Sequence, residues 1–107
     1  MQKIVKLRDV LLNLDDFERR DALFMVRDEE WGLDTKCAVL DPDDVEDDAD
    51  EEPRFAMDNN LKYALNMQDI RGIVTNAYEQ KSNCTENELL EAFLYYYNHD
   101  AFIDLES

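Results

Sequence analysis

A run of twelve residues in the middle of the chain, Asp41 to Glu52, separates two segments of the sequence that can contribute to a folded core. Nine of the twelve residues are acidic and none is basic, with Pro42 inside the run and Pro53 directly after it. A block of like charges cannot pack its side chains together, so we expect an acidic mobile loop over residues 41–52. The folded body must then be built from the segments on either side.

Those two segments are apolar enough to form a core. The chain has 107 residues, of which 45% are hydrophobic and 10% aromatic, and this length is the usual size of one domain. We therefore expect a single domain over residues 1–107, without internal repeats.

The segment before the loop predicts a helix followed by a hairpin. A core-facing helical stripe is formed by Leu7, Val10, Leu11, Leu14 and Phe17. The continuous apolar run Ala22–Val26 is typical of a buried strand, and Lys36–Leu40 has the composition of its hairpin partner.

The segment after the loop first predicts a strand over residues 61–67. Its apolar positions alternate with the period of a half-buried strand, which places Tyr63 on the inner face and Ala64 on the outer face. Asn66 is then expected to cap a helix, with Gly72 on the side of that helix opposite the core. The core face of this helix is formed by Ile70, Ile73, Val74, Ala77 and Tyr78.

A second helix follows, and its start is marked by the capping box Thr85-Glu-Asn-Glu88. Its expected inner face consists of Leu89, Leu90, Phe93, Tyr96 and Tyr97. The tail over residues 101–105 is apolar enough to dock as a short edge strand. The whole order predicts an α+β fold, a small mainly antiparallel sheet of three to four strands with about three helices packed on one face.

The charge of the chain indicates which partners it can bind. There are 27 acidic and 11 basic residues, a net charge of −16, and removing the acidic run still leaves 18 acidic residues against 11 basic ones. Direct binding of nucleic acid or of an anionic membrane is disfavoured because the phosphates would be repelled. A basic protein partner is favoured instead.

The sequence contains no pattern that indicates catalysis, a metal or a cofactor, so we expect a protein that is not an enzyme. Frames of the acidic run that start at Asp44 and Asp48 fail the EF-hand pattern, because Ala49 and Pro53 stand where glycine is required. The single His99 and the two separated cysteines do not form a zinc pattern.

The N-terminus and the cysteines predict the compartment. The first residues lack the apolar stretch of a signal peptide, and Cys37 and Cys84 do not form a C-x-x-C pair. The longest apolar runs are too short to span a membrane. These features predict a soluble cytoplasmic protein.

Aromatic residues that lie among glutamates are the best candidates for a binding surface. Tyr95 is expected on the outer face of the last helix, together with Glu88 and Glu91, as an interface anchor or as an ordinary exposed tyrosine. Trp31 follows Glu29 and Glu30, and folding back over the hairpin core is favoured over an exposed anchor. The acidic run adds further candidate contacts: Asp43, Asp44, Glu46, Asp47, Asp48, Asp50, Glu51 and Glu52.

Several short segments resemble a known family, and they are Leu7-Arg-Asp-Val-Leu11, Leu14-Asp-Asp16, Asn60-Leu-Lys-Tyr-Ala-Leu65, Gln68-Asp-Ile70 and Asp100-Ala-Phe-Ile103. The family they resemble is that of small acidic bacterial immunity proteins, including those of contact-dependent growth-inhibition systems. The resemblance covers both ends of the chain but neither the hairpin nor the acidic run. It implies a protein that neutralises a nuclease toxin in the cytosol, and it carries no catalytic residues.

The hypothesis that follows is a stoichiometric inhibitor that binds and neutralises a basic nuclease toxin domain. The first alternative is a nucleic-acid mimic that inhibits a nuclease or a DNA-binding protein, which requires rigid rows of carboxylates at phosphate-like intervals. The second is an acidic adaptor domain whose charge serves only solubility.

Overall fold

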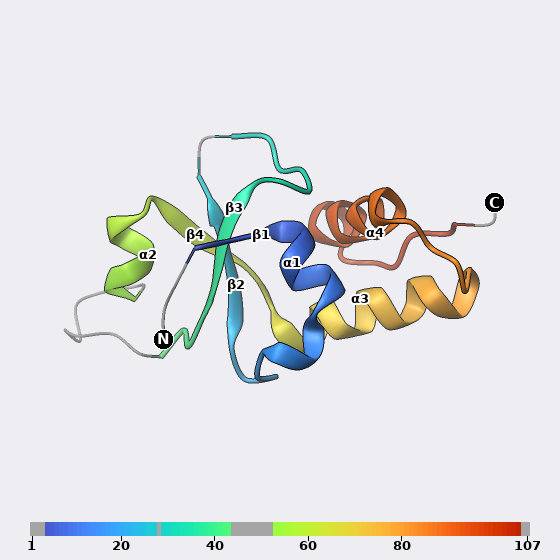
Figure 1. The fold of residues 1–107 in the computed structure, drawn as a ribbon, viewed down its shortest axis with the longest axis horizontal. Helices are drawn as coiled ribbons and strands as arrows, with labels where there is room; N and C mark the ends of the chain where they lie inside the picture. The colour runs from blue at the N-terminus through green and yellow to red at the C-terminus, as the bar shows by residue number, and fades with distance from the viewer. Residues whose placement is uncertain (1–3, 28, 44–52, 106–107) are drawn as a thin grey trace.

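The structure, a computed structural model, describes residues 4–27, 29–43 and 53–105 (Figure 1). In these residues the chain alternates between short strands and helices. In chain order the elements are β1 (Val5–Lys6), α1 (Leu7–Leu12), a 3-10 helix η1 (Leu14–Asp16), β2 (Ala22–Val26), β3 (Lys36–Leu40), α2 (Arg54–Asp58), β4 (Leu61–Asn66), α3 (Met67–Gln80) and α4 (Glu86–His99).

The strands form one antiparallel sheet in the order β1-β3-β2-β4. The predicted hairpin is confirmed, because β2 pairs with β3, with Ala22 opposite Leu40 and Met25 opposite Cys37. The two-residue strand β1, which the sequence did not predict, extends the sheet on the far side of β3. An antiparallel sheet packed with helices confirms the predicted α+β class.

Helices cover both faces of the sheet, three of them (α1, α3 and α4) on one face and the short α2 on the other (Figure 1). Strand β2 supplies both cores: Leu23 and Met25 lie in the larger one, and Ala22 and Phe24 lie in the smaller one beside Ala56 of α2. A strand that is buried on both faces has a continuous apolar sequence. This explains the apolar run of β2 and the need for a fourth helix, which was not predicted.

The alternation predicted for β4 is wrong because this strand contains a β-bulge. Leu65 pairs with Leu23, whereas Tyr63 pairs with Phe24, the next residue of β2, so Ala64 is an extra residue. As a result Ala64 is buried and Tyr63 is 46% exposed, the reverse of the prediction. Since strand side chains alternate with a period of two, one inserted residue moves the following positions to the other face.

The first helix is shorter than the predicted stripe. Helix α1 ends at Leu12, and Asn13 leaves the helical conformation with φ −130° and ψ 45°. The side-chain Nδ2 of Asn13 donates a hydrogen bond to the carbonyl oxygen of Asp9 at 2.8 Å, which satisfies one of the last carbonyls of the helix. Leu14 and Phe17 still pack against the larger core, although they lie beyond the helix.

Both predicted helix caps are confirmed. At the start of α3, the N–H of Asp69 donates to Oδ1 of Asn66 at 2.7 Å. At the start of α4, the N–H of Glu88 donates to Oγ1 of Thr85 at 3.2 Å, and the N–H of Thr85 donates to Oε1 of Glu88 at 3.0 Å. Helix α4 ends where Asp100 adopts a left-handed conformation with φ 53°, which aspartate tolerates better than most residues.

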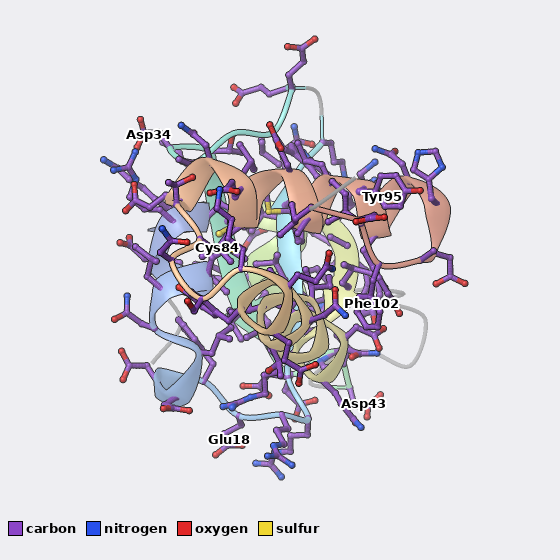
Figure 2. All side chains as sticks on the ribbon, turned by 90° about the vertical axis from the view of Figure 1, so that its right-hand side faces the viewer. Glu18, Asp34, Asp43, Cys84, Tyr95 and Phe102 are labelled. Atoms are coloured by element: carbon purple, nitrogen blue, oxygen red, sulfur yellow. The ribbon has the colours of Figure 1, made fainter. Side chains whose placement is uncertain are left out.

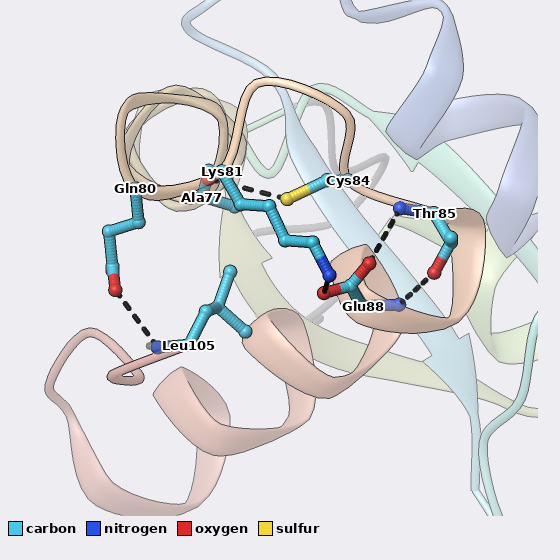
Figure 3. Close-up of polar contacts among 7 residues, drawn as sticks. All are labelled: Ala77, Gln80, Lys81, Cys84, Thr85, Glu88 and Leu105. Carbon is cyan, nitrogen blue, oxygen red and sulfur yellow. Dashed lines mark hydrogen bonds and ion pairs between the residues drawn. The ribbon is translucent and has the colours of Figure 1, made fainter. Parts of the chain in front are cut away.

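The tail over residues 101–105 docks on the body, but no strand is assigned within it, so the predicted edge strand is wrong. The amide of Gln80 holds the main chain of the tail on both sides. Its Nε2 donates to the carbonyl oxygen of Ile103 at 2.8 Å. Its Oε1 accepts from the N–H of Leu105 at 2.9 Å (Figure 3). The side-chain amide of Gln80 therefore makes main-chain hydrogen bonds to the tail of the kind that a neighbouring strand would make.

The ring of Phe102 lies over α3 and α4. It is 5.5 Å from the ring centroid of Tyr96, and 3.7 Å from the position that a Cβ atom would take at Gly72. Phe102 nevertheless remains half-exposed, and Figure 2 shows it between α4 and α3. Gly72 thus faces the docked tail rather than the core, which agrees with its predicted place opposite the core face of α3.

Candidate functional site

Trp31 lies where the loop between β2 and β3 meets α4. Its indole Nε1 donates a hydrogen bond to the carbonyl oxygen of Val26 at 2.9 Å. Its ring packs against Tyr97, with 4.7 Å between centroids, and against Phe93 at 6.2 Å. The half-buried tryptophan is therefore folded back over the larger core, which is the alternative that the sequence favoured.

An open hollow of about 460 Å³ lies beside this tryptophan, and we call it the Trp31 hollow. It brings together three residues that the sequence singled out with others that it did not. The lining residues are Arg27, Glu29, Glu30, Trp31, Lys62, Leu94, Tyr97 and Asn98. The loop, strand β4 and helix α4 thus meet at one place.

The Trp31 hollow combines an aromatic wall with charges of both signs. Glu29 and Glu30 are exposed, whereas Lys62 is half-buried and places its Nζ 5.5 Å from the centroid of the indole ring. That distance is within the range of a cation–π contact. Sequence reasoning missed Lys62 because it lies on a strand that is distant from Trp31 along the chain. With Arg27 also in the lining, the described residues of the hollow carry two positive and two negative formal charges.

Tyr95 and Glu91 lie on the exposed part of α4 but do not line the Trp31 hollow. Tyr95 is 38% exposed, and its ring stacks on His99 one turn later, with 4.4 Å between ring centroids. Figure 2 shows Tyr95 on the C-terminal part of α4. The two aromatic candidates therefore belong to separate surfaces.

Glu88 is engaged within the chain and does not share the exposure of Tyr95. Besides the capping box, its Oε2 accepts a hydrogen bond from Nζ of Lys81 at 2.8 Å (Figure 3). The hydrogen bond from Lys81 lowers the pKa of the Glu88 carboxyl, and the bond from the Thr85 backbone lowers it further. The carboxylate of Glu88 thus fixes the start of α4 against the end of α3.

The candidate contacts of the acidic run are only partly described. Asp43 follows the end of β3, and its N–H donates to Oδ1 of Asp41 at 2.9 Å. It does not line the Trp31 hollow. The other candidates lie outside the described residues: Asp44, Glu46, Asp47, Asp48, Asp50, Glu51 and Glu52.

A second hollow, of about 700 Å³, carries carboxylates that the sequence did not single out. It is lined by Val5, Asp9, Asn13, Asp16, Phe17, Glu18, Asp21 and Val39. Burial raises the pKa of the Asp21 carboxyl, and the nearby charges of Glu18 and Asp41 raise it further. Asp16, Glu18 and Asp21 lie in one six-residue segment of the chain, and the fold adds Asp9 of α1 to them.

The cysteines and the histidine do not form a reactive pair in the structure. Burial raises the pKa of the Cys37 thiol to about 12. The half-buried Cys84 donates from Sγ to the carbonyl oxygen of Ala77 at 3.3 Å, and desolvation raises its pKa as well. Helix α4 lies between Cys84 and His99 along the chain.

Two further features concern metals and membranes. Within residues 4–27, 29–43 and 53–105, no three side chains of histidine, cysteine, aspartate or glutamate are grouped as metal ligands. In the same ranges, no helix has the length and apolar character needed to cross a membrane.

The fold and its surface define a small α+β protein with a half-buried tryptophan beside a charged hollow. The chain belongs to the family described as Domain of unknown function (DUF7716), whose pattern matches residues 4–105. No curated protein and no solved structure matches the chain.

Proposed function

We propose that this protein is a stoichiometric inhibitor that binds a basic protein surface, in the manner of an immunity protein that neutralises a nuclease toxin in the cytosol. A nuclease holds its substrate with lysines and arginines, so its substrate cleft is basic. An acidic protein can occupy or flank such a cleft.

The observation that supports this proposal is the surplus of carboxylates at the surface. The chain has 27 acidic residues and 11 basic ones, so pairing every base with one acid still leaves 16 carboxylates over. No charged side chain is fully buried in the described part of the chain. The described carboxylates are therefore at least partly accessible to solvent, where they can attract a basic partner.

The electrostatic field and the aromatic residues would act at different stages of binding. The negative field would accelerate encounter with a basic surface, and this gain would fall as salt screens the charges. Glu29 and Glu30 would then pair with lysines or arginines of the partner. Because exposed ion pairs add little affinity, an aromatic side chain such as Trp31 or Tyr95 would supply the desolvated contact.

The candidate partner for the experiment is the product of the gene next to this one, which we expect to contain a cationic nuclease domain, and its association with this protein is followed by stopped flow. The expected association rate constant falls steeply as ionic strength rises from about 0.02 M to about 0.5 M, because the Debye length shortens over that range. Inhibition of the nuclease should be complete at one equivalent. A rate that stays constant across this range, or a nuclease that remains active with excess protein, contradicts the proposal.

A matched pair of variants separates local contacts from net charge. E29Q/E30Q removes two carboxylates beside Trp31, whereas D58N/E79Q removes two exposed carboxylates elsewhere. Both variants change the net charge equally. We expect both to slow association slightly, and only E29Q/E30Q to accelerate dissociation of the complex.

A further inference from the structure

We propose that the Trp31 hollow is the binding site for one arginine side chain of the basic partner, and that Lys62 occupies the place of this arginine in the free protein. This inference rests on the proposed function and names the chemistry that the hollow would receive.

The position of Lys62 is the observation that points to a cation. Its ammonium group lies 5.5 Å from the centroid of the Trp31 ring, so the free protein already holds a positive charge against this aromatic wall. The hollow leaves about 460 Å³ open beside that contact, which is room for a side chain from another molecule. The contact between Lys62 and Trp31 indicates that this aromatic surface attracts a cation.

A guanidinium group fits this hollow better than the ammonium group of Lys62. It is planar, so it can stack on the indole, and its fork of donors matches a carboxylate with two parallel hydrogen bonds. Glu29 and Glu30 lie on the exposed side of the hollow and can supply those carboxylate oxygens. The apolar stem of the arginine would pack against Leu94.

Trp31 is positioned firmly enough to act as such a wall. Its N–H is bonded to the carbonyl oxygen of Val26 at 2.9 Å, and its ring contacts Tyr97 and Phe93. A ring that is already ordered loses little conformational entropy on binding. Lys62, by contrast, has a long flexible stem and can move out of the hollow towards solvent at low cost.

The charge balance of the hollow explains why the site would exchange one cation for another. Among the described lining residues, Arg27 and Lys62 match Glu29 and Glu30 in number, so a second cation is less favoured while Lys62 remains in place. When Lys62 leaves, the two carboxylates exceed the single remaining base. Lys62 is thus a competitor for the partner arginine, and removing its charge should strengthen binding.

The test uses the full chain and a short acetylated peptide of alternating glycine and arginine. Trp31 is the only tryptophan of the chain, so its emission reports on this hollow alone. Calorimetry of the same titration reports binding anywhere on the protein. We expect the emission of Trp31 to change saturably and in parallel with the heat of binding.

Three variants sharpen the test. Loss of two exposed ion pairs in E29Q/E30Q should weaken the affinity by about three- to tenfold, whereas D58N/E79Q, with the same net charge, should stay close to the parent. Lys62→Met keeps the apolar stem and removes the charge, so it should bind the peptide more tightly. Lys62→Arg keeps a competing cation, so it should not bind the peptide more tightly than the parent.

The outcomes separate this inference from the proposed function. Heat of binding without any change in Trp31 emission means that the peptide binds elsewhere, which overturns the arginine site and leaves the basic partner standing. Equal affinity of Lys62→Met and the parent also overturns the inference. A titration without heat or emission change contradicts both the inference and the preference for a basic partner.

Discussion

Trp31 and Tyr95 have the same local sequence context, an aromatic residue among glutamates, but the fold gives them different surroundings. Trp31 is half-buried, bonded to Val26, packed on two aromatic rings and placed beside a hollow. Tyr95 is 38% exposed and stacks on His99 of its own helix. Local composition therefore identifies aromatic candidates without separating a residue that belongs to the core from one that lies on the surface.

Because Trp31 is packed into the core and Tyr95 is not, a binding contact at Trp31 would be coupled to the stability of the protein, whereas one at Tyr95 would not. Trp31 connects the β2–β3 loop to α4 and the larger core. Tyr95 has no such role, because its ring contacts a neighbour on the same helix. Four substitutions test this contrast, each measured by urea unfolding followed by far-ultraviolet circular dichroism.

The largest effect is expected for Trp31→Ala. Removing a half-buried indole leaves a void between the loop and α4, so the free energy of unfolding should fall by about 2–3 kcal/mol, somewhat less than for a fully buried aromatic residue. Tyr95→Ala is the matched control on α4. Equal losses for the two variants would contradict the contrast.

An intermediate effect is expected for Gln80→Ala, which acts on the tail that packs against Tyr96. The variant loses the hydrogen bonds to the main chain of Ile103 and Leu105, which should cost about 1–2 kcal/mol. Hydrogen exchange at the amide of Leu105 should become faster. An accompanying shift of Trp31 emission would show that the two surfaces are coupled, contrary to this expectation.

A smaller effect is expected for Trp31→Phe. The phenyl ring keeps most of the aromatic packing but cannot donate to the carbonyl oxygen of Val26, so the expected loss is about 1 kcal/mol. The loss should lie between those of Trp31→Ala and Tyr95→Ala. A loss as large as that of Trp31→Ala would mean that the hydrogen bond, rather than the packing, holds the loop.

The smallest effect on stability is expected for Tyr95→Ala. An exposed side chain without a hydrogen bond to the core should change the free energy of unfolding by no more than about 0.5 kcal/mol. Its effect should instead be seen in partner binding, if Tyr95 is an anchor. A destabilisation above about 1 kcal/mol would place Tyr95 in the folded framework.

Much of the fold follows from local patterns, because those patterns act within a few residues. The apolar run of β2 and the hairpin with β3 were predicted, and so were the caps at Asn66 and Thr85. The bulge at Ala64 was not predictable, since it depends on which residues of β2 face those of β4. Likewise, the composition around Arg54–Asp58 does not indicate a helix that packs on the second face of the sheet.

The candidate site divides in the same way. Glu29, Glu30 and Trp31 are adjacent in sequence, so their composition was enough to group them. Lys62 and Leu94 reach the same hollow only because β4 and α4 are brought there by the fold. Glu88 was predicted both to cap α4 and to share the exposed face of Tyr95. The structure confirms the cap, and the hydrogen bond from Lys81 directs the carboxylate towards the end of α3 instead of the face of Tyr95.

The sequence by itself determined the α+β class, the helix caps and the excess of negative charge, because these depend on residue type and on spacing along the chain. Tertiary structure alone decided which aromatic residue lies beside a hollow, that the charge of Asp41 acts on Asp21, and which cation lies against Trp31. Those features arise from contacts between segments far apart in the chain, and the geometry of such contacts is set by packing of the whole core.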